Sequence, residues 1–387
     1  MSDLVLSSSV RQNLLSLQST ADLLATTQNR LATGKKVNTA LDNPTNFFTA
    51  QSLDNRASDI NNLLDGIGNG VQVLQAANTG ITSLQKLVDT AKSIANQVLQ
   101  NPVGYTARST VSSAAALGGT AANLVDGTTI KSGDVLSIAA SAGQPAFTFT
   151  FGASNSLAQL NASLAPSNLT ASLDSSNKLV ITTTNDAASS TIGAVTLSAS
   201  GGTATFGTAT APVADPASQS ARASLVTQYN NTIAQITTTA QDASFNGVNL
   251  LNGDNLKLTF NETGKSTLAI NGVSFSASGL GLSSLNSGTD FLDNNSANKV
   301  LTALGSASST LRSEASTLGS NLSVVQIRQD FSKSLINVLQ TGSSNLTLAD
   351  TNEEAANSQA LSTRQSIAVS ALALANQSQQ SVLQLLR

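Results

Sequence analysis

Apolar residues recur at helical spacing near the N-terminus of the 387-residue chain. The positions that share one stripe are Val10, Leu14, Leu17, Ala21, Leu24 and Leu31. Steps of three, four or seven residues place such side chains on one face of an α-helix. The segment ATGKK interrupts the pattern, so this helix is expected to stop at Gly34.

A second and much longer helix is predicted from about Pro44 to Gln100. Asp42 or Asn43 can cap it, and proline suits its first turn. Its apolar stripe comprises Ile60, Leu64, Ile67, Val71, Leu74, Ile81, Leu84, Val88, Ala91, Ile94 and Val98. The helix also contains Gly66, Gly68, Gly70 and Gly80. Each glycine weakens a helix by about 1 kcal/mol relative to alanine, so tertiary or quaternary packing has to compensate.

The composition changes abruptly after residue 103. From Gly104 to about Pro216 the chain is rich in Gly, Ser, Thr and Ala, and short runs alternate in polarity. The run AFTFTFG places Phe147, Phe149 and Phe151 on one face of a strand, and SLAQLNASL indicates one short helix. We predict a β-rich domain, either α+β or mostly β, inserted between helices.

Helical spacing returns at Ala217 and is followed by a predicted β-hairpin within residues 245–276. Leu256, Leu258 and Phe260 alternate on its first strand, and the segment NETGK forms the turn. A long helix follows, with its stripe running from Val300 to Val338. The segment TGSSN (residues 341–345) is expected to break it, so that the last helix begins near Leu346.

The last helix carries two neighbouring stripes, which together make a wide apolar face. One stripe is Leu361, Ala368, Leu372, Ala375, Val382 and Leu386, and the other is Ile367, Ala371, Leu374, Ser378, Ser381 and Leu385. A wide face suits a helix that is surrounded by several others rather than paired with one. Its predicted partners are the N-terminal helix, Leu4 to Leu31, and the same two helices of adjacent copies.

The predicted fold is therefore mainly α, with long terminal coiled-coil helices packed together, a β-hairpin and an inserted β-rich (α+β) outer domain. The expected divisions are 1–43 (terminal helix and linker), 44–103 (first half of a helical core), 104–216 (the insert), 217–344 (the rest of the core) and 345–387 (C-terminal helix). Heptad spacing alone favours a bundle within one chain. The apolar C-terminus and the low charge favour a polymer interface instead.

Composition removes several function classes. The chain has no Cys and no His, so thiolate and imidazole chemistry and the commonest transition-metal ligands are absent, and neither an enzyme nor a metal or cofactor site is expected. Only 11% of residues are charged and the net charge is −3, which gives no basic footprint for nucleic acid. The charge-free stretch 365–386 contains too many Gln, Asn and Ser for a membrane span. The N-terminus lacks the pattern of a Sec signal peptide.

Three ordered motifs resemble bacterial flagellin. NRLATGKKVNTALDNPTNFFTA (Asn29 to Ala50) is similar to the segment that joins the family's first two helices. FNGVNLL (Phe245 to Leu251) resembles its turn into the hairpin. LADTNEEAANSQAL and LALANQSQQSVLQLL resemble its C-terminal helix. The resemblance covers roughly residues 1–100 and 217–387.

The resemblance implies a structural subunit of an extracellular filament that serves swimming motility and is exported by the flagellar type III route. Its implied partners are further copies of itself, an export chaperone, the filament cap, hook-associated junction proteins and other flagellins. The residues expected at the assembly interface are Val10, Leu14, Leu17, Leu24, Leu31, Ile67, Val71, Leu74, Ile367, Leu372, Leu374, Val382, Leu385 and Leu386.

One departure from the family pattern lies in the position of the insert. It precedes the FNG turn, an arrangement that resembles some flagellins of α-proteobacteria. Two other functions stay open at the level of sequence. A hook-filament junction protein shares the terminal helices, and an extracellular adhesin or glycan-active enzyme could be carried by residues 104–216.

Overall fold

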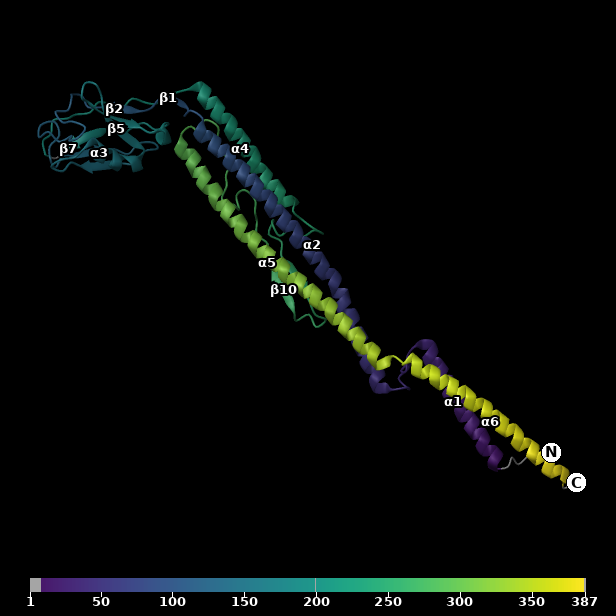
Figure 1. Ribbon diagram of the computed structural model, residues 1–387. Helices are drawn as coiled ribbons and strands as arrows, with labels where there is room; N and C mark the ends of the chain where they lie inside the picture. Colours follow the sequence, from purple (N-terminus) through teal and green to yellow (C-terminus); the bar gives the residue numbers. More distant parts are fainter. Residues whose placement is uncertain (1–7, 199, 386–387) are drawn as a thin grey trace. The chain divides into compact units, whose positions relative to one another are not determined.

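Five long helices account for most of the chain in the computed structural model, which describes residues 8–198 and 200–385 (Figure 1). They are α1 (Ser8–Thr33), α2 (Pro44–Gln100), α4 (Pro216–Asp242), α5 (Asn294–Thr347) and α6 (Thr351–Leu385). The short helix α3 (Leu157–Leu164) and the strands lie between them in sequence. The mainly helical fold with packed terminal helices and a β-rich middle region is confirmed.

Local sequence explains where these helices begin and end. Gly34, with φ +66°, follows the last residue of α1 and adopts a conformation that favours glycine. The Asn43 side chain accepts a hydrogen bond from Asn46 N (3.0 Å) and so caps α2, whose first residue is Pro44. Asp350 Oδ1 accepts from Asn352 N (2.9 Å) at the start of α6. The predicted bounds of α2 are confirmed.

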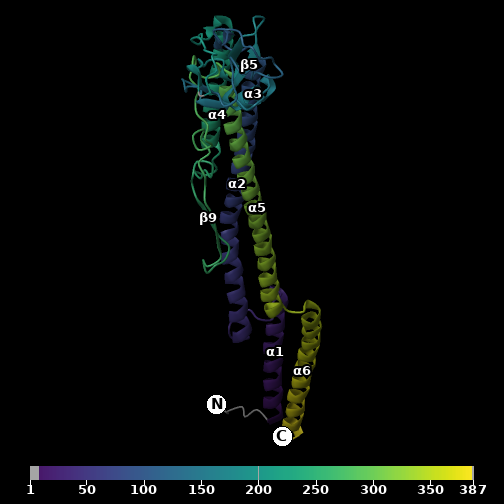
Figure 2. The ribbon, with the colours of Figure 1, turned by 90° about the vertical axis from the view of Figure 1, so that its left-hand side faces the viewer.

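The chain divides into two compact units. The first comprises Met1–Gly70, Lys257–Leu268 and Val324–Arg387, and the second comprises Val71–Leu256 and Ala269–Ser323. In the first unit α1 lies beside α6 (Figures 1 and 2). A small core joins α2 to α5 and contains Ala57, Ile60, Ile336 and Leu339. Two backbone hydrogen bonds join the linkers: in one, Lys36 N donates to Thr347 O (2.8 Å), and in the other, Ala349 N donates to Gly34 O (3.0 Å).

One prediction about the first unit was wrong. The break expected at residues 341–345 is absent, because α5 continues through TGSSN to Thr347 and α6 begins at Thr351. Ser343 is buried, and a Cβ placed on Gly342 would lie 3.5 Å from Leu53 Cδ1 of α2, an ordinary van der Waals distance. Contact of α5 with α2 at this point outweighs the low helix propensity of these residues.

The hairpin consists of β9 (Leu256–Thr259) and β10 (Thr267–Ile270), as predicted. It explains Gly70, because a Cβ there would lie 2.4 Å from Leu258 Cδ2. Gly80 has the same role in the second unit, where a Cβ would lie 2.6 Å from both Ala243 Cβ and Leu251 Cδ1. Close packing against α2 therefore offsets the low helix propensity of two of its four glycines.

In the second unit α4 runs beside α2 and α5 (Figure 2). Each helix buries an apolar stripe there, represented by Leu74, Ile81 and Leu84 of α2, Ile233 and Ile236 of α4, and Leu304 and Leu311 of α5. The buried Arg222 of α4 joins the helix ends. Its guanidinium donates to Pro102 O (2.7 Å), Asn101 O (2.9 Å) and Phe291 O (2.6 Å). The backbone carbonyls that follow α2 thus bind the Arg222 guanidinium, a contact that no sequence pattern indicated.

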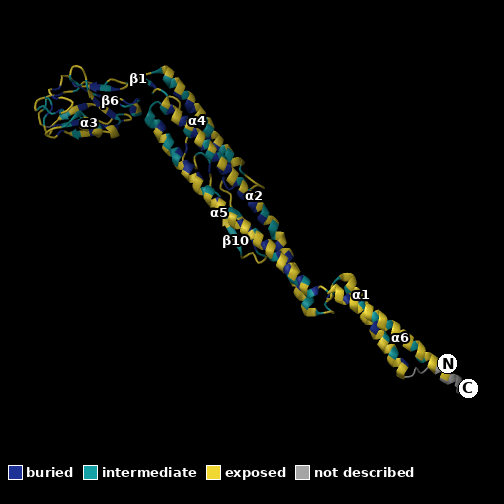
Figure 3. Cartoon of the chain, viewed as in Figure 1, coloured by how far each residue is buried: buried dark blue, intermediate teal, exposed yellow. Residues whose placement is uncertain are grey.

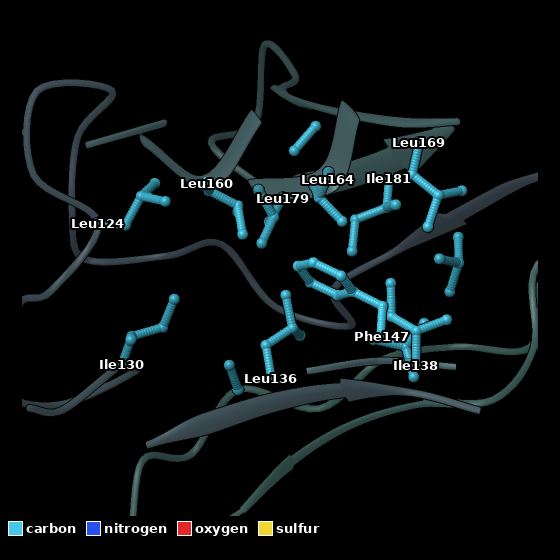
Figure 4. Packing of buried hydrophobic residues seen from close by; sticks show 14 of the residues in the cluster. Leu124, Ile130, Leu136, Ile138, Phe147, Leu160, Leu164, Leu169, Leu179 and Ile181 are labelled. Atoms are coloured by element: carbon cyan, nitrogen blue, oxygen red, sulfur yellow. The ribbon is translucent and has the colours of Figure 1, made fainter. Parts of the chain in front are cut away.

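The segment between α2 and α4 forms two three-stranded antiparallel sheets. One has the order β2-β6-β5 (Thr110–Ser112, Leu179–Thr183, Leu169–Leu173) and the other β4-β3-β7 (Phe147–Thr150, Val135–Ile138, Val195–Ser198). Their inner faces share one apolar core that includes Leu136, Phe147 and Ile181, with Leu160 and Leu164 of α3 (Figure 4). The paired strands β1 (Tyr105–Ala107) and β8 (Val213–Ala214) connect this core to the helices.

Candidate assembly surface

Helices α1 and α6 meet along one seam of alternating three- and four-residue steps. On α1 the less exposed residues include Val10, Leu17, Thr20, Leu24 and Thr27. On α6 they are Glu354, Ser358, Leu361, Gln365, Ala368, Leu372 and Ala375. This spacing is the a/d pattern of a coiled coil. The first of the two stripes predicted for α6 therefore packs on α1 over its described part.

An ion pair fixes the end of this seam that is nearest the linkers. Arg30 Nη1 lies 3.1 Å from Glu354 Oε1, and the Glu354 side chain is only 10% exposed. Glu354 lies in the first turn of α6 and Arg30 in the last turn of α1, so each charge also complements the dipole of its own helix. The pair sets the register in which the two helices meet.

The second stripe of α6 has no cover within the described chain. Ile367 is 65% exposed and Leu374 is 71% exposed, and Val369 is exposed beside them. On α1, Leu14, Leu15, Leu23 and Leu31 are also exposed. Figure 3 shows that exposed residues predominate on both helices. Each such side chain forfeits about 1.5–3 kcal/mol of burial free energy in water.

A third uncovered stripe lies on α5 in the first unit. Val324, Ile327, Phe331 and Val338 follow one another at steps of three, four and seven residues, and all four are exposed. The neighbouring face of α5, with Val325, Ser332 and Ile336, is buried. All the exposed large hydrophobic side chains of the described residues, apart from Val213, Phe245 and Val273, belong to the first unit. Contiguous apolar surface of this kind marks an interaction site.

The residues expected at the interface separate into four groups. Val10, Leu17, Leu24 and Leu372 lie in the seam between α1 and α6, whereas Leu14, Leu31, Ile367 and Leu374 are exposed. Ile67, Val71 and Leu74 are buried in the chain's own core, so their side chains are not available to a second copy. The side chains of Val382 and Leu385, and Leu386 as a whole, lie outside the described residues.

Sequence reasoning missed the stripe on α5 as a surface. It placed Phe331 and Val338 on the stripe that runs from Val300, but the buried face follows Val325, Ser332 and Ile336 instead. The available signal was the presence of two apolar stripes in residues 324–339, one of them beginning at Val324. Leu15, Leu23 and Leu41 were also missed, because they belong to no heptad stripe.

Chemistry at this surface is limited to packing and a few ion pairs. Within residues 8–198 and 200–385, no three of His, Cys, Asp and Glu come together as a group that could hold a metal ion. None of the described helices has the length and apolarity needed to cross a membrane. Besides the pair of Arg30 with Glu354, Arg56 Nε lies 2.8 Å from Glu262 Oε1 and ties α2 to the hairpin turn.

Comparisons with known proteins agree with this architecture. Residues 2–130 match the bacterial flagellin N-terminal helical region, and residues 301–386 match the bacterial flagellin C-terminal helical region. The first match extends beyond residue 100, where the resemblance seen in the sequence ended. The two matched regions contain the seam between α1 and α6 and the exposed stripe of α5.

Individual relatives are also flagellins. Flagellin FljM of Caulobacter vibrioides is 32% identical over 165 residues, which is 42% of this chain and 59% of the relative. Flagellin FljK of the same organism gives the same values, and flagellin A of Rhizobium meliloti is 35% identical over 88 residues, 23% of this chain and 22% of the relative. The chain thus spans about 59% of the length of the first two relatives. From the two terminal matches and the helices that carry them, the chain belongs to the bacterial flagellin family, and its relatives are of the α-proteobacterial type.

Proposed function

We propose that this chain is the repeating structural subunit of a flagellar filament and that it polymerises through the helical packing of its terminal helices. The observation that carries the proposal is the second apolar stripe of α6, which includes Ile367 and Leu374 and is uncovered in the single chain. A seam with α1 already occupies the first stripe. The remaining stripe therefore requires a helix from another molecule.

The exposed face of α1 supports the same arrangement. Four leucines of α1 are exposed outside the seam: Leu14, Leu15, Leu23 and Leu31. Both members of the helix pair therefore offer apolar surface to neighbours. Contacts between two different surfaces of one chain repeat without closing and generate a helical polymer when the rotation does not complete a ring. The low charge, 11% of residues, limits the number of ions that such repeated burial would desolvate.

The proposed division of labour follows the chain. Residues 1–43 and 345–387 form the inner layer, 44–103 and 217–344 form the surrounding helical wall, and 104–216 form the outer domain. The polar side chains of the last helix, which alternate with its stripes, face a water-filled channel. The insert has its own core. It is connected to the helices through the ribbon β1–β8 and through a hydrogen bond from Ser189 Oγ to Asp293 Oδ2 (2.6 Å) beside the start of α5, which suits an outward position.

Family membership supports a proposal for the partners and the location. Flagellins are filament components and structural proteins rather than enzymes. For this chain we propose export through the flagellar route, extracellular assembly and no catalytic role. Its partners are then further copies, an export chaperone, the filament cap and hook-associated junction proteins.

A hook-filament junction protein is the second candidate, because such proteins share terminal helices of this kind. The two functions differ in copy number. A junction protein occupies a single layer and does not extend a filament of its own, whereas a filament subunit elongates without limit. The third alternative, an adhesin or a glycan-active enzyme, rests on residues 104–216 alone. It predicts that deletion of these residues abolishes the main function, whereas a filament subunit should still assemble without them.

Seeded growth tests the proposal. Purified monomer is mixed with short filament fragments sheared from the producing cells, and filament length is followed by electron microscopy. We expect elongation and a defined critical concentration. Monomer that leaves the seeds unchanged in length would contradict a filament subunit and favour the junction protein.

A substitution on the uncovered stripe sharpens the test. Leu374→Ser removes one exposed leucine, and the loss of about 1.5–3 kcal/mol per contact predicts a critical concentration that is about tenfold to a hundredfold higher. The matched control is Val213→Ser, because Val213 is also exposed but lies on β8 in the second unit. If both substitutions raised the critical concentration equally, the uncovered stripe of α6 would no longer support the proposed filament contact.

A further inference from the structure

Asp293 joins the helical core to the insert, residues 104–216. Its Oδ1 accepts a hydrogen bond from Ser296 N (2.9 Å), so Asp293 caps the start of α5. Its Oδ2 accepts a hydrogen bond from Ser189 Oγ of the insert (2.6 Å). The positive end of the helix dipole favours the charged form of a carboxylate in this position. The contact with Ser189 is therefore a charge-assisted hydrogen bond, which is a short and strong kind.

The neighbours of Asp293 in the sequence hold its carboxylate on the core. Leu292 O accepts a hydrogen bond from Gly104 N (3.1 Å), and Asn294 Oδ1 accepts one from Arg222 Nη2 (3.2 Å). Burial lowers the pKa of the Arg222 guanidinium, and the negative charge of Asp293 acts against that change. Asp293 is thus fixed both by its helix and by the buried cation near it.

Ser189 belongs to a loop that is part of the insert's own body. The two residues before it, Ala187 and Ala188, are buried. Ala187 N donates to Thr184 O (3.1 Å), and Ser190 N donates to Ala187 O (3.0 Å). Because the loop is anchored in this way, the Ser189 hydroxyl moves with the insert as a whole.

Few other contacts tie the insert to the helices. Its apolar core consists of insert residues alone. The ribbon β1–β8 is short, shifts in register between Tyr105 and Ala107, and is largely exposed. Within the described parts of the chain, the contact of Ser189 with Asp293 is the one hydrogen bond between residues 108–212 and the helical core. Bodies that share no large apolar interface move relative to each other by default.

A mostly polar cavity of about 370 Å³ lies beside this contact. Asp186 and Ser190 line it on the insert, and Asp290 and Lys299 line it on the core. Apolar packing therefore contributes little at this point, and the space allows the insert to turn towards or away from α5.

We propose that the hydrogen bond between Ser189 and Asp293 is a latch. While it is closed, it holds the insert in one orientation on the helical core, and when it opens, the insert turns about the ribbon β1–β8. The register shift in β1 suits a hinge, because hinges are a few residues at element ends that absorb changes in backbone angles. Opening leaves Asp293 Oδ1 on Ser296 N, so the cap of α5 is the same in both states.

Distances between two spin labels test the latch in the monomer. The chain has no cysteine of its own, so labels can be attached to Ser175→Cys on the insert and Ser309→Cys on α5, both at exposed positions. With Ser189 in place we expect one narrow distance distribution. Ser189→Ala removes the donor and should lower the ratio of latched to unlatched molecules about tenfold. The unlatched molecules should contribute a broad distribution at other distances.

Two further variants and one further measurement separate the latch from an effect on folding. Ser189→Thr keeps the hydroxyl and should keep the narrow distribution. Ser190→Ala makes the same change one residue further along the loop and should keep it too. Hydrogen exchange in strands β5 and β6 should be equal in all variants, because the core of the insert is untouched.

An unchanged narrow distribution in Ser189→Ala would overturn the proposal, because the ribbon alone would then fix the insert. A broad distribution with Ser189 in place would also overturn it, because the hydrogen bond would then hold nothing. Equal broadening in Ser190→Ala, or lost exchange protection in β5 and β6 of Ser189→Ala, would have the same consequence. All these measurements use the monomer, so a failure of seeded growth would overturn the filament proposal alone.

Discussion

Arg30 Nη1 lies 3.1 Å from Glu354 Oε1 and links the last turn of α1 to the first turn of α6 across the sequence. The pair sits where the two linkers also exchange backbone hydrogen bonds, including Lys36 N to Thr347 O. The relative register of the terminal helices is therefore defined at one end by charge and by backbone pairing. The rest of the seam mixes large apolar residues, such as Leu17, Leu24 and Leu372, with small and polar ones.

A double-mutant cycle on Arg30 and Glu354 should give a coupling of about 0.5–1 kcal/mol, because one partner is partly exposed. The readout is the opening free energy of the first turns of α6, from native-state hydrogen exchange after Arg30→Ala, Glu354→Ala and both. Arg364→Ala in the same helix is the control, since no carboxylate among the described residues lies within 4.0 Å of it. Strict additivity of the two substitutions would show that the pair contributes nothing.

Glycines of the long helices should respond to alanine with opposite signs. Gly80→Ala places a methyl group about 2.6 Å from Ala243 Cβ and Leu251 Cδ1, and should destabilise the chain by about 1–3 kcal/mol. Gly305→Ala has nothing within 4 Å of the new methyl group, and should stabilise α5 by up to about 1 kcal/mol. Urea unfolding followed by circular dichroism measures both. A stabilising Gly80→Ala would refute the close approach.

The buried Arg222 should be among the most sensitive charged positions. Arg222→Met leaves Asn101 O, Pro102 O and Phe291 O without this donor, and should lower the unfolding free energy by about 3–5 kcal/mol. Arg222→Lys keeps the charge and should lose less. Arg312→Met, at an exposed position of α5, is the control for removing a cation. Similar losses in Arg222→Met and Arg312→Met, measured by urea unfolding, would contradict the role assigned to Arg222.

Asp126 makes the insert sensitive to acid. Burial by itself raises the pKa of Asp126, but hydrogen bonds from the Thr129 hydroxyl and from the N–H groups of Thr128, Ile130 and Thr129 lower it to about 2, from an ordinary value of 3.8. A lowered folded-state pKa means that the carboxylate stabilises the fold above pH 3.8 and that this contribution is lost as the pH falls through about 2. The contribution is about 1–2 kcal/mol after allowance for partial solvent screening.

The test compares Asp126→Asn with the wild type in urea titrations at pH 7, 4 and 2. Pulsed hydrogen exchange of peptides from residues 104–216 reports the unfolding of the insert. The substitution should lower stability at pH 7 and make much less difference at pH 2, where the wild-type carboxyl is about half protonated in the folded protein and most of its contribution to stability is lost. Asp65→Asn, at an exposed position of α2, should show no such trend. A penalty for Asp126→Asn that stays constant with pH would exclude this carboxylate as the cause.

Local signals were sufficient for most element boundaries. Gly34 and the pair Asn43–Pro44 mark helix ends because glycine and capping residues act on neighbouring backbone groups, and such effects need no distant partner. The same reasoning fails at residues 341–345, where small residues predict a break. There Ser343 is buried and Gly342 lies against Leu53 of α2, a contact between residues far apart in the chain.

The sequence by itself determined most of the helical ends, the hairpin, the inserted β-rich segment and the existence of two apolar stripes on α6, because periodicity and turn chemistry are local properties. Only the tertiary structure decided which stripe is covered. It assigned Leu361, Ala368 and Leu372 to the seam with α1, left Ile367 and Leu374 exposed, and buried Ile67 and Leu74 in the core. A hydrophobic period shows that a face will be buried, but the partner that buries it is fixed by packing between segments that the period does not connect.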